Sequence, residues 1–199
     1  MNWDLLKAFD EAVYKFLTGF MSEGLTGFMK LMTFIGSGWT ITTLAVAIPF
    51  FVFILKKKKY YRAALLIPLN IAVGSLLNEL LKQLFHRARP DILRLVEVTG
   101  YSFPSGHSMN SIIFCGFLIH LILRFMRSRF KYPAAVGTGF LILLIGTSRV
   151  YLGVHYASDV IAGFITGAAW LAFFINISGK FMMEPDKGSK NNLRSGRKM

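Results

Sequence analysis

Long apolar segments separated by short polar connections dominate this chain. A helix that crosses a bilayer needs about 20 apolar residues, because each residue adds 1.5 Å along the axis. Five segments approach that length, at residues 36–55, 63–81, 105–123, 132–148 and 156–178. The mean hydropathy is +0.50 and only 17% of residues are charged, against about 25% in a typical soluble domain. The pattern predicts an all-α fold, a polytopic membrane helical bundle.

The first 35 residues follow a different pattern. Apolar residues recur at helical spacing from Trp3 to Phe20, and charged residues interleave with them. Such a helix is amphipathic and can lie on the membrane surface. A tilted helix over residues 8–35 could instead cross if Glu23 and Lys30 reach water. We favour about six transmembrane helices over five, with an amphipathic N-terminal segment.

The net charge of +13 is concentrated in connections and in the tail. Fifteen of the 23 basic residues fall in three groups, Lys56–Lys59 with Arg62; Arg124, Arg127, Arg129 and Lys131; and Lys180, Lys187, Lys190, Arg194, Arg197 and Lys198. The positive-inside rule places such groups in the cytoplasm, so this distribution argues for a membrane protein and against a nucleic-acid partner. We expect one domain over residues 1–180 and a flexible basic cytoplasmic tail over 181–199. The connections 82–104 and 148–156 are then extracytoplasmic.

Three polar clusters interrupt the apolar sequence, and all three fall in or next to those two connections. In the first, Lys82 and Arg89 are seven residues apart, which places them two turns apart on one helix face. Pro90 ends the helix by forcing Arg89 out of helical geometry. Glu79 is expected to pair with Lys82 or to make another buried polar contact. Arg87 is expected to be an ordinary residue of the membrane interface. Two cations that reach lipid head groups would be the alternative.

The second cluster is Pro104-Ser105-Gly106-His107, where the fourth apolar segment begins. Ser105 is a suitable N-cap, and Gly106 allows the backbone to approach a ligand closely. Free N–H groups at a helix start bind anions, and His107 in the first turn would reach the same ligand. The cluster could equally be a plain helix start with an interfacial histidine.

The third cluster is Ser148-Arg149 followed by His155 and Asp159. An i,i+4 spacing makes His155 and Asp159 neighbours on a helix face. The carboxylate can hold one ring nitrogen and leave the other free as a nucleophile. Arg149 offers a planar fork to phosphate oxygens. A simple His–Asp pair beside an interfacial arginine is the alternative.

Together the clusters resemble the three signatures of the type 2 phosphatidic acid phosphatase (PAP2) superfamily. Lys-x6-Arg-Pro, Pro-Ser-Gly-His and Ser-Arg-x5-His-x3-Asp occur in full, in order, over residues 82–159. The apolar segments around them fit the bacterial integral-membrane branch of that family. No signature position departs from the family pattern.

The resemblance implies a role for each signature residue. His155 would attack phosphorus and form a phosphohistidine, Asp159 would orient His155, and His107 would protonate the leaving group. The phosphate oxygens would be held by the remaining signature residues, which are Lys82, Arg89, Ser105, Gly106 and Arg149. No role is assigned to Ser148. No metal and no cofactor are expected, because three cations can neutralise phosphate charge and the sequence has no compact cluster of metal ligands.

The expected function is hydrolysis of a lipid phosphate, such as phosphatidylglycerophosphate or phosphatidic acid, at the extracytoplasmic face of the cell membrane. The expected partners are the lipid substrate and the bilayer. An undecaprenyl pyrophosphate phosphatase of cell-wall carrier recycling is the main alternative, since only the leaving group differs. A silent membrane protein that binds anionic lipids is less favoured, because binding alone needs no positioned nucleophile. A vanadate haloperoxidase is disfavoured by the membrane segments. The sequence does not determine the oligomeric state.

Overall fold

The computed structural model describes residues 4–182, and within them every regular element is helical. The helices are α1 (Asp4–Thr18), α2 (Glu23–Ile35), α3 (Gly38–Ile54), a 3₁₀ turn η1 (Lys58–Tyr60), α4 (Tyr61–Phe85), α5 (Gly106–Phe125), α6 (Lys131–Tyr151) and α7 (Ala157–Met182). The expected all-α class is confirmed. Most of the expected tail, from residue 183 onward, lies outside the described residues, while residues 181 and 182 still belong to α7.

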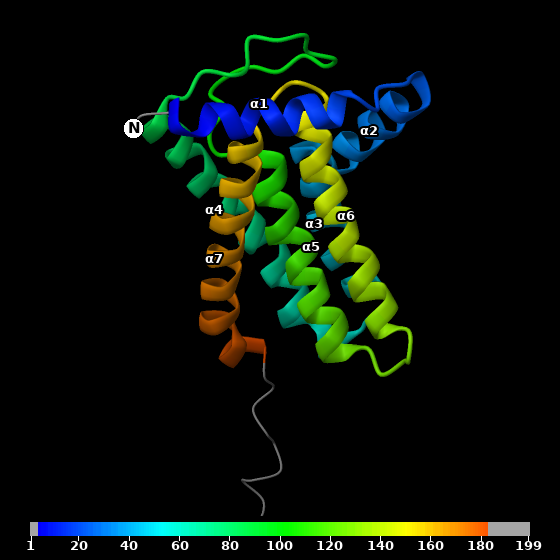
Figure 1. Ribbon diagram of the computed structural model, residues 1–199. Coiled ribbons are helices and arrows are strands. Elements are labelled where there is room, and N and C mark those ends of the chain that lie inside the picture. The colour runs from blue at the N-terminus through cyan, green and yellow to red at the C-terminus, as the bar shows by residue number, and fades with distance from the viewer. Residues whose placement is uncertain (1–3, 183–199) are drawn as a thin grey trace, which may run out of the picture.

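Helix α1 lies across one end of the bundle, nearly at right angles to the upright helices (Figure 1). It packs against α6 and α7. The chain then turns at residues 19–22, and α2 starts at the N-cap Ser22, whose hydroxyl accepts a hydrogen bond from the Leu25 N–H at 3.2 Å. A single tilted helix over residues 8–35 was therefore a wrong expectation. The amphipathic, in-plane interpretation of the N-terminal segment fits this arrangement.

Four helices are individually long and apolar enough to span a membrane, and α2 with α3 can form a fifth span that is bent by 48°. Four or five candidate spans among the described residues are fewer than the six we favoured. The bounds of α3 to α7 otherwise agree with the five predicted segments to within a few residues. Large apolar side chains cover the outside of these helices, among them Trp39, Leu84, Val136 and Ile165. Such a surface suits lipid rather than water.

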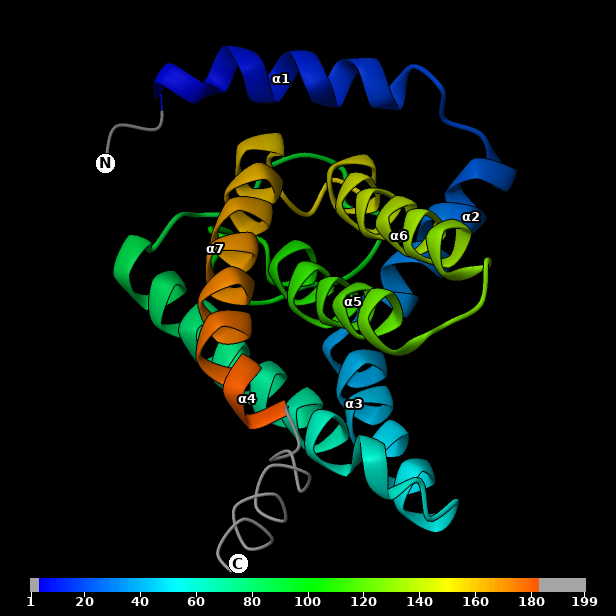
Figure 2. The ribbon, with the colours of Figure 1, turned by 90° about the horizontal axis from the view of Figure 1, so that it is seen from below.

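Helix α5 forms the centre of the bundle and packs against α3, α4, α6 and α7 (Figure 2). Its inner face carries Met109, Ile113 and Phe117, which recur every four residues and are at most 1% exposed. This spacing places all three on one side of the helix. The core therefore holds α5 in a fixed position, and with it the polar residues at its N-terminus.

Glycines bring α7 unusually close to α5. A Cβ atom on Gly163 would lie 2.7 Å from the Ser105 carbonyl oxygen, and one on Gly167 would lie 2.8 Å from the Met109 carbonyl oxygen. Small residues at four-residue spacing allow such close helix packing in membranes. As a result, the Ser105 N–H donates to the Asp159 carbonyl oxygen at 3.0 Å. The second and third polar clusters are thus joined directly through the backbone.

Candidate active site

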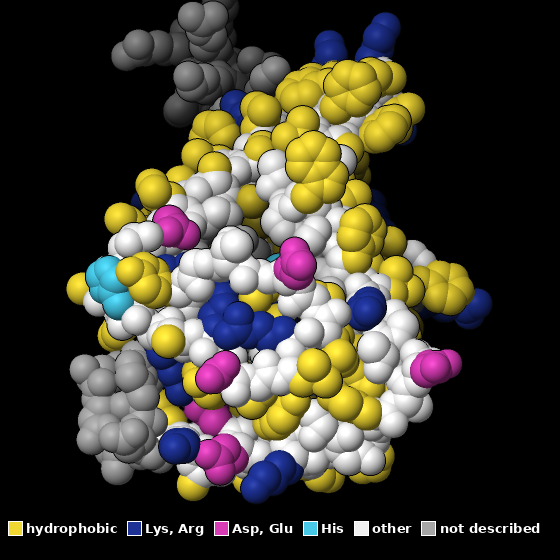
Figure 3. Space-filling model, turned by 90° about the horizontal axis from the view of Figure 1, so that it is seen from above, with side chains coloured by type: hydrophobic (Ala, Val, Ile, Leu, Met, Phe, Trp, Pro, Cys, Tyr) yellow, Lys and Arg dark blue, Asp and Glu magenta, His cyan; other side chains and the backbone are white. Residues whose placement is uncertain are grey.

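The three polar clusters meet at the end of the bundle that α1 covers. Two connections form this end, residues 86–105 between α4 and α5 and residues 152–156 between α6 and α7. Figure 3 shows Lys and Arg side chains near the middle of this face, with acidic side chains around them. Helix ends and the two loops therefore bring together side chains that are up to 77 residues apart in sequence, as between Lys82 and Asp159.

His155 and Asp159 form the centre of the site. His155 Nδ1 lies 3.4 Å from Asp159 Oδ2, and both side chains are buried. The contact was predicted, but only Asp159 is helical: His155 lies two residues before α7, and Asp159 is in its first turn. The carboxylate also accepts a hydrogen bond from the Tyr156 N–H at 3.0 Å. The ring therefore meets a carboxylate that the backbone has already fixed.

Ser102 is a part of this centre that the sequence did not reveal. It is fully buried, and its hydroxyl donates to Asp159 Oδ2 at 2.5 Å and lies 3.4 Å from His155 Nδ1. Its N–H donates to the Arg87 carbonyl oxygen at 2.8 Å, which anchors this part of the loop. Ser102 lies two residues before the second signature, and no spacing rule singles it out.

Arg89 approaches His155 from the opposite side of the ring. Its Nη1 lies 3.1 Å from His155 Nε2. Three backbone carbonyl oxygens hold the guanidinium, those of Thr99, Gly100 and Val154, at 2.9 to 3.0 Å. Arg89 is not on a helix face with Lys82, because α4 ends at Phe85, four residues before Arg89. The loop rather than α4 therefore positions this cation.

Arg149 lies at the end of α6 and is only 2% exposed. One guanidinium nitrogen donates to the Thr33 hydroxyl of α2. Its buried Nε has no hydrogen-bond partner among the described residues. An unsatisfied buried donor is costly unless a ligand or water completes it. Arg149 is therefore suited to accept an anion from within the site.

Lys82 lies beside the start of α5. Its Nζ would be 3.7 Å from a Cβ atom on Gly106, so the absent side chain of Gly106 leaves room for the ammonium group. Glu79 does not form an ion pair with Lys82 and is not buried. Its carboxylate is exposed and accepts a hydrogen bond from Gln83 at 2.9 Å. The expected Glu79 partnership is therefore wrong, and Lys82 has no ion-pair partner among the described residues.

Ser105 and His107 occupy the start of α5 as predicted. Ser105 is the N-cap, and its hydroxyl accepts from the Ser108 N–H. The His107 imidazole is within electrostatic range of the charges of Arg149, Lys82 and Arg89 and of His155. The second cluster therefore faces the other two. Ser148 donates to the Ile145 carbonyl oxygen within α6 and has no contact with the site's charged groups.

Arg87 is not an ordinary interfacial residue, contrary to our expectation. It is 5% exposed and forms ion pairs with Asp159 at 2.5 Å and with Asp10 of α1 at 2.9 Å. The pairing joins the N-terminal helix to the centre of the site. In the sequence, Asp10 does not differ from the other charged residues of an amphipathic helix, so this link could not be predicted.

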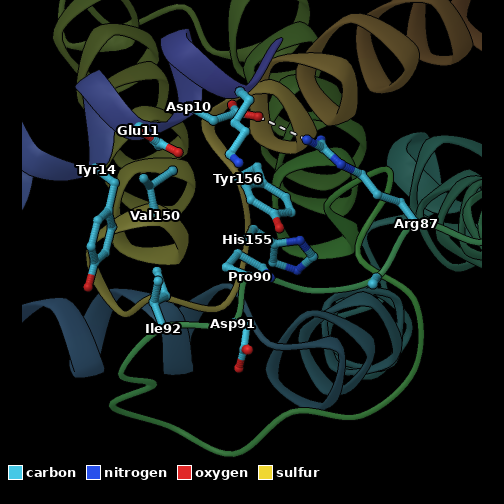
Figure 4. Close-up of a pocket in the computed structure, with 12 residues that line it drawn as sticks. Asp10, Glu11, Tyr14, Arg87, Pro90, Asp91, Ile92, Val150, His155 and Tyr156 are labelled. Atoms are coloured by element: carbon cyan, nitrogen blue, oxygen red, sulfur yellow. Dashed lines mark hydrogen bonds and ion pairs between the residues drawn. The ribbon is translucent and has the colours of Figure 1, made fainter. Parts of the chain in front are cut away.

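A pocket of about 480 Å³ lies between α1 and His155 (Figure 4). Asp10, Glu11 and Tyr14 line it from α1, and Pro90 and Tyr156 line it near the site. Figure 4 shows the His155 ring on one side of this space and the α1 side chains on the other. Helix α1 thus covers the site without closing it.

Burial sets the protonation state of the nucleophile candidate. It lowers the pKa of His155 to about 4, an effect that Asp159 opposes and that Arg149 and Arg89 reinforce. A neutral imidazole is therefore the dominant form at neutral pH, and with Nδ1 facing Asp159 its lone pair lies on Nε2, beside Arg89. Burial also lowers the pKa of Arg89, with Asp159 acting in the opposite direction.

No group of three or more His, Cys, Asp and Glu side chains between residues 4 and 182 is arranged to hold a metal ion. Catalysis without a metal stays a prediction. In that prediction, Lys82, Arg89 and Arg149 neutralise the phosphate charge that a metal ion would otherwise neutralise.

Fold and site together define a polytopic membrane protein with a buried His155–Asp159 pair beside the cations Arg89 and Arg149. The chain belongs to the PAP2 superfamily, whose family model matches residues 63–183, more than half of its length. It is a lipid phosphate hydrolase.

Individual relatives agree with this assignment. Phosphatidylglycerophosphatase B of Bacillus subtilis is 33% identical over 177 residues, covering 88% of this chain and 85% of the relative. The crystal structure of the transmembrane PAP2 type phosphatidylglycerolphosphate phosphatase from Bacillus subtilis matches with a TM-score of 0.80 and 30% identity, covering 89% of this chain and 88% of that chain. An undecaprenyl-diphosphatase of Sulfolobus acidocaldarius is 33% identical over 105 residues, 52% of this chain and 47% of the relative.

Proposed function

We propose that this protein removes the terminal phosphate of phosphatidylglycerophosphate, or of a similar lipid phosphomonoester, through a phosphohistidine intermediate. The observation that carries the proposal is the double contact of the His155 ring. Its Nδ1 faces the Asp159 carboxylate and its Nε2 faces Arg89, a cation without a carboxylate partner among the described residues. A phosphate bound to Arg89 would therefore lie in front of the nitrogen that can attack it.

In the first step, the His155 Nε2 lone pair would form a bond to phosphorus. The bond between phosphorus and the lipid oxygen breaks, and the electron pair leaves with that oxygen. A protonated His107 would give its proton to the leaving oxygen, which releases the dephosphorylated lipid. Asp159 would stabilise the positive charge that develops on the His155 ring.

In the second step, water would attack the phosphohistidine. His107, now neutral, would take a proton from that water, and inorganic phosphate would leave with Nε2 free again. Lys82, Arg89 and Arg149, together with Ser105 and the Gly106 backbone, would neutralise the equatorial oxygens in both steps. Phosphoryl transfer depends mainly on such positioning and charge neutralisation.

The proposed place of the reaction is the extracytoplasmic face of the cell membrane, with the C-terminus in the cytoplasm. Basic residues support this orientation, because Lys56–Lys59 and the Arg124–Lys131 group lie at the end of the bundle opposite the site. Single-cysteine labelling in intact cells tests it: a cysteine at Leu93 should react with an impermeant reagent, and one at Ser128 should not. The reverse pattern would place the site in the cytoplasm.

The lipid substrate can be tested with purified protein in detergent that contains EDTA. We expect phosphate release to be fastest from phosphatidylglycerophosphate, slower from phosphatidic acid and slowest from undecaprenyl pyrophosphate. Radiolabel from the terminal phosphate should appear on the protein in an acid-labile, alkali-stable form, as a phosphohistidine requires. Preference for the pyrophosphate would instead favour the carrier-recycling function, which the Sulfolobus relative supports over a smaller part of the chain. Failure on all three lipids would refute the proposal.

A further inference from the structure

Asp10 of α1 is a buried carboxylate in a helix that otherwise lies on the surface. It is 3% exposed, whereas the next residue, Glu11, is exposed. Asp10 Oδ1 accepts from the Ser158 N–H at 2.8 Å, and Oδ2 accepts from the Ser158 hydroxyl at 2.7 Å. Both contacts lie at the start of α7, one residue before Asp159. An acidic group at a helix N-terminus is favourable, but burial on this scale needs a charged partner as well.

Arg87 is that partner, and it also reaches Asp159. Its Nη2 donates to Asp10 Oδ2 at 2.9 Å, and its Nη1 donates to Asp159 Oδ1 at 2.5 Å and to the Ser158 hydroxyl at 2.7 Å. The guanidinium lies 4.0 Å from the centre of the Tyr156 ring, which fixes its plane. Figure 4 shows the Asp10–Arg87 contact beside the pocket and His155. Asp159 thus uses one oxygen for Arg87 and the other for His155.

The charges of this network explain why two carboxylates are present. Arg87 and Asp159 alone would form a neutral pair, and a positive charge on His155 would then have no net counter-charge. With Asp10 included, the three groups carry a net charge of −1 beside the His155 ring. A negative charge is what stabilises the ring once it bears a phosphoryl group.

We propose that Asp10 is a positioning residue of the phosphotransfer reaction, acting through Arg87. It keeps Arg87 from neutralising Asp159 and holds the Asp159 carboxylate against His155. This inference rests on the proposed function, because it concerns the same histidine. It assigns a role in the chemistry to the amphipathic N-terminal helix, which carries none of the three signatures.

The test compares Asp10→Asn with wild-type enzyme on phosphatidic acid in vesicles of neutral lipid. We expect kcat to fall about 10–100-fold, as loss of an outer partner of an active group commonly does, and KM to change less than about twofold. Asp10→Glu, which keeps the charge, should recover part of kcat. Lys15→Gln is the control, since Lys15 is an exposed charged residue on the same helix, and it should keep wild-type activity. An equal loss in Lys15→Gln would assign the effect to membrane contact of α1 and overturn the proposal.

A double-variant comparison tests whether Asp10 acts through Arg87. Arg87→Gln should lower kcat, and adding Asp10→Asn to it should change kcat by no more than about twofold, because residues in one network are not additive. Losses that multiply would mean that Asp10 acts independently, and the proposal would fall.

The acid limb of the pH profile of kcat/KM provides a second readout, because a purely structural role of Asp10 would leave its position unchanged. His155 faces Asp159, Arg89, Arg149 and His107, and the two variants alter only the counter-charge on Asp159. Asp10→Asn leaves Arg87 to neutralise Asp159, so the limb should move to lower pH. Arg87→Gln frees Asp159 for His155, so the limb should move to higher pH. Unmoved limbs would reject the inference, whereas a wild-type enzyme without any turnover would instead reject the proposed function.

Discussion

The two sides of the His155 ring differ in how their charges are satisfied. On the Nε2 side, Arg89, Arg149 and Lys82 have no ion-pair partner among the described residues, and Arg149 keeps a buried N–H without an acceptor. On the Nδ1 side, Asp159 and Asp10 share Arg87, and hydroxyl and backbone groups complete both carboxylates.

This difference in charge pairing corresponds to two proposed tasks, binding a phosphate on the Nε2 side and holding the His155 ring on the Nδ1 side. A cation without a carboxylate partner would be neutralised by an arriving phosphate, so its unpaired charge favours binding. Groups that must hold a ring at one angle gain from having every hydrogen bond made, since a partly satisfied buried network is neither stable nor well defined. The following predictions test this division, from the largest expected effect to the smallest.

Replacing His155, the proposed nucleophile, should have the largest effect. We expect His155→Asn to lower kcat on the order of 10⁴-fold or more, because no other group in the site would form the covalent bond. Phosphate release from phosphatidic acid with EDTA present measures it. His86→Asn is the matched control, since His86 is exposed and adopts a left-handed conformation that Asn tolerates. Equal release by wild type and His155→Asn would mean that His155 is not the nucleophile.

Removing one cation from the Nε2 side should come next. Arg149→Gln should lower kcat/KM about 10²–10³-fold, as loss of one oxyanion contact does. Arg149→Lys should recover only part, because an ammonium lacks the planar fork. Steady-state kinetics on the same lipid measure both. Arg129→Gln, an exposed change at the opposite end of the bundle, should leave the kinetics unchanged, and a similar loss there would indicate a general effect of charge.

The pH dependence should reveal the state of the His155 ring. Attack needs the neutral imidazole, and the pKa of His155 is lowered to about 4. The value of kcat/KM should therefore hold at pH 5 and fall as the pH drops through about 4, approaching tenfold per pH unit below it. An acid limb near 6.5, the ordinary value for histidine, would contradict the buried neutral ring.

Loss of a single hydroxyl on the Nδ1 side should have the smallest effect. Ser102→Ala removes one donor to Asp159, but Arg87 and the Tyr156 N–H still hold the carboxylate. We expect kcat to fall about tenfold with little change in KM. Ser108→Ala is the comparison, since this buried serine forms its hydrogen bond with Ser105 rather than with His155 or Asp159. A change in KM without a change in kcat would mean that Ser102 acts in substrate binding rather than in positioning Asp159.

Local sequence patterns predicted the upright helices and the residues with which the site is built. Apolar segments long enough to span a bilayer are stable there as helices, so the predicted segments agree closely with the bounds of α3 to α7. The Ser105 N-cap and the His155–Asp159 contact depend on residues within four positions, which spacing describes well. The whole Lys82–Asp159 set also forms known signatures, so its membership in one site could be expected from the resemblance.

The rest depends on tertiary packing. An amphipathic segment is compatible with lying on a membrane or crossing it at a tilt, and the turn at residues 19–22 decided between them. Arg87 is separated from Asp159 by 72 residues and from Asp10 by 77. Nothing in the sequence distinguishes Asp10 from Glu11, because which of two adjacent carboxylates is buried depends on how α1 is rotated against α7.

The close approach at Gly163 and Gly167 has a consequence for judging other chains of this kind. The distance between the first turns of α5 and α7, which carry His107 and Asp159, is set partly by two positions without a side chain. A homologue with all three signatures intact but a bulky residue at either glycine would hold its histidines apart. Such a chain would look active in every alignment of signature residues and yet be inert.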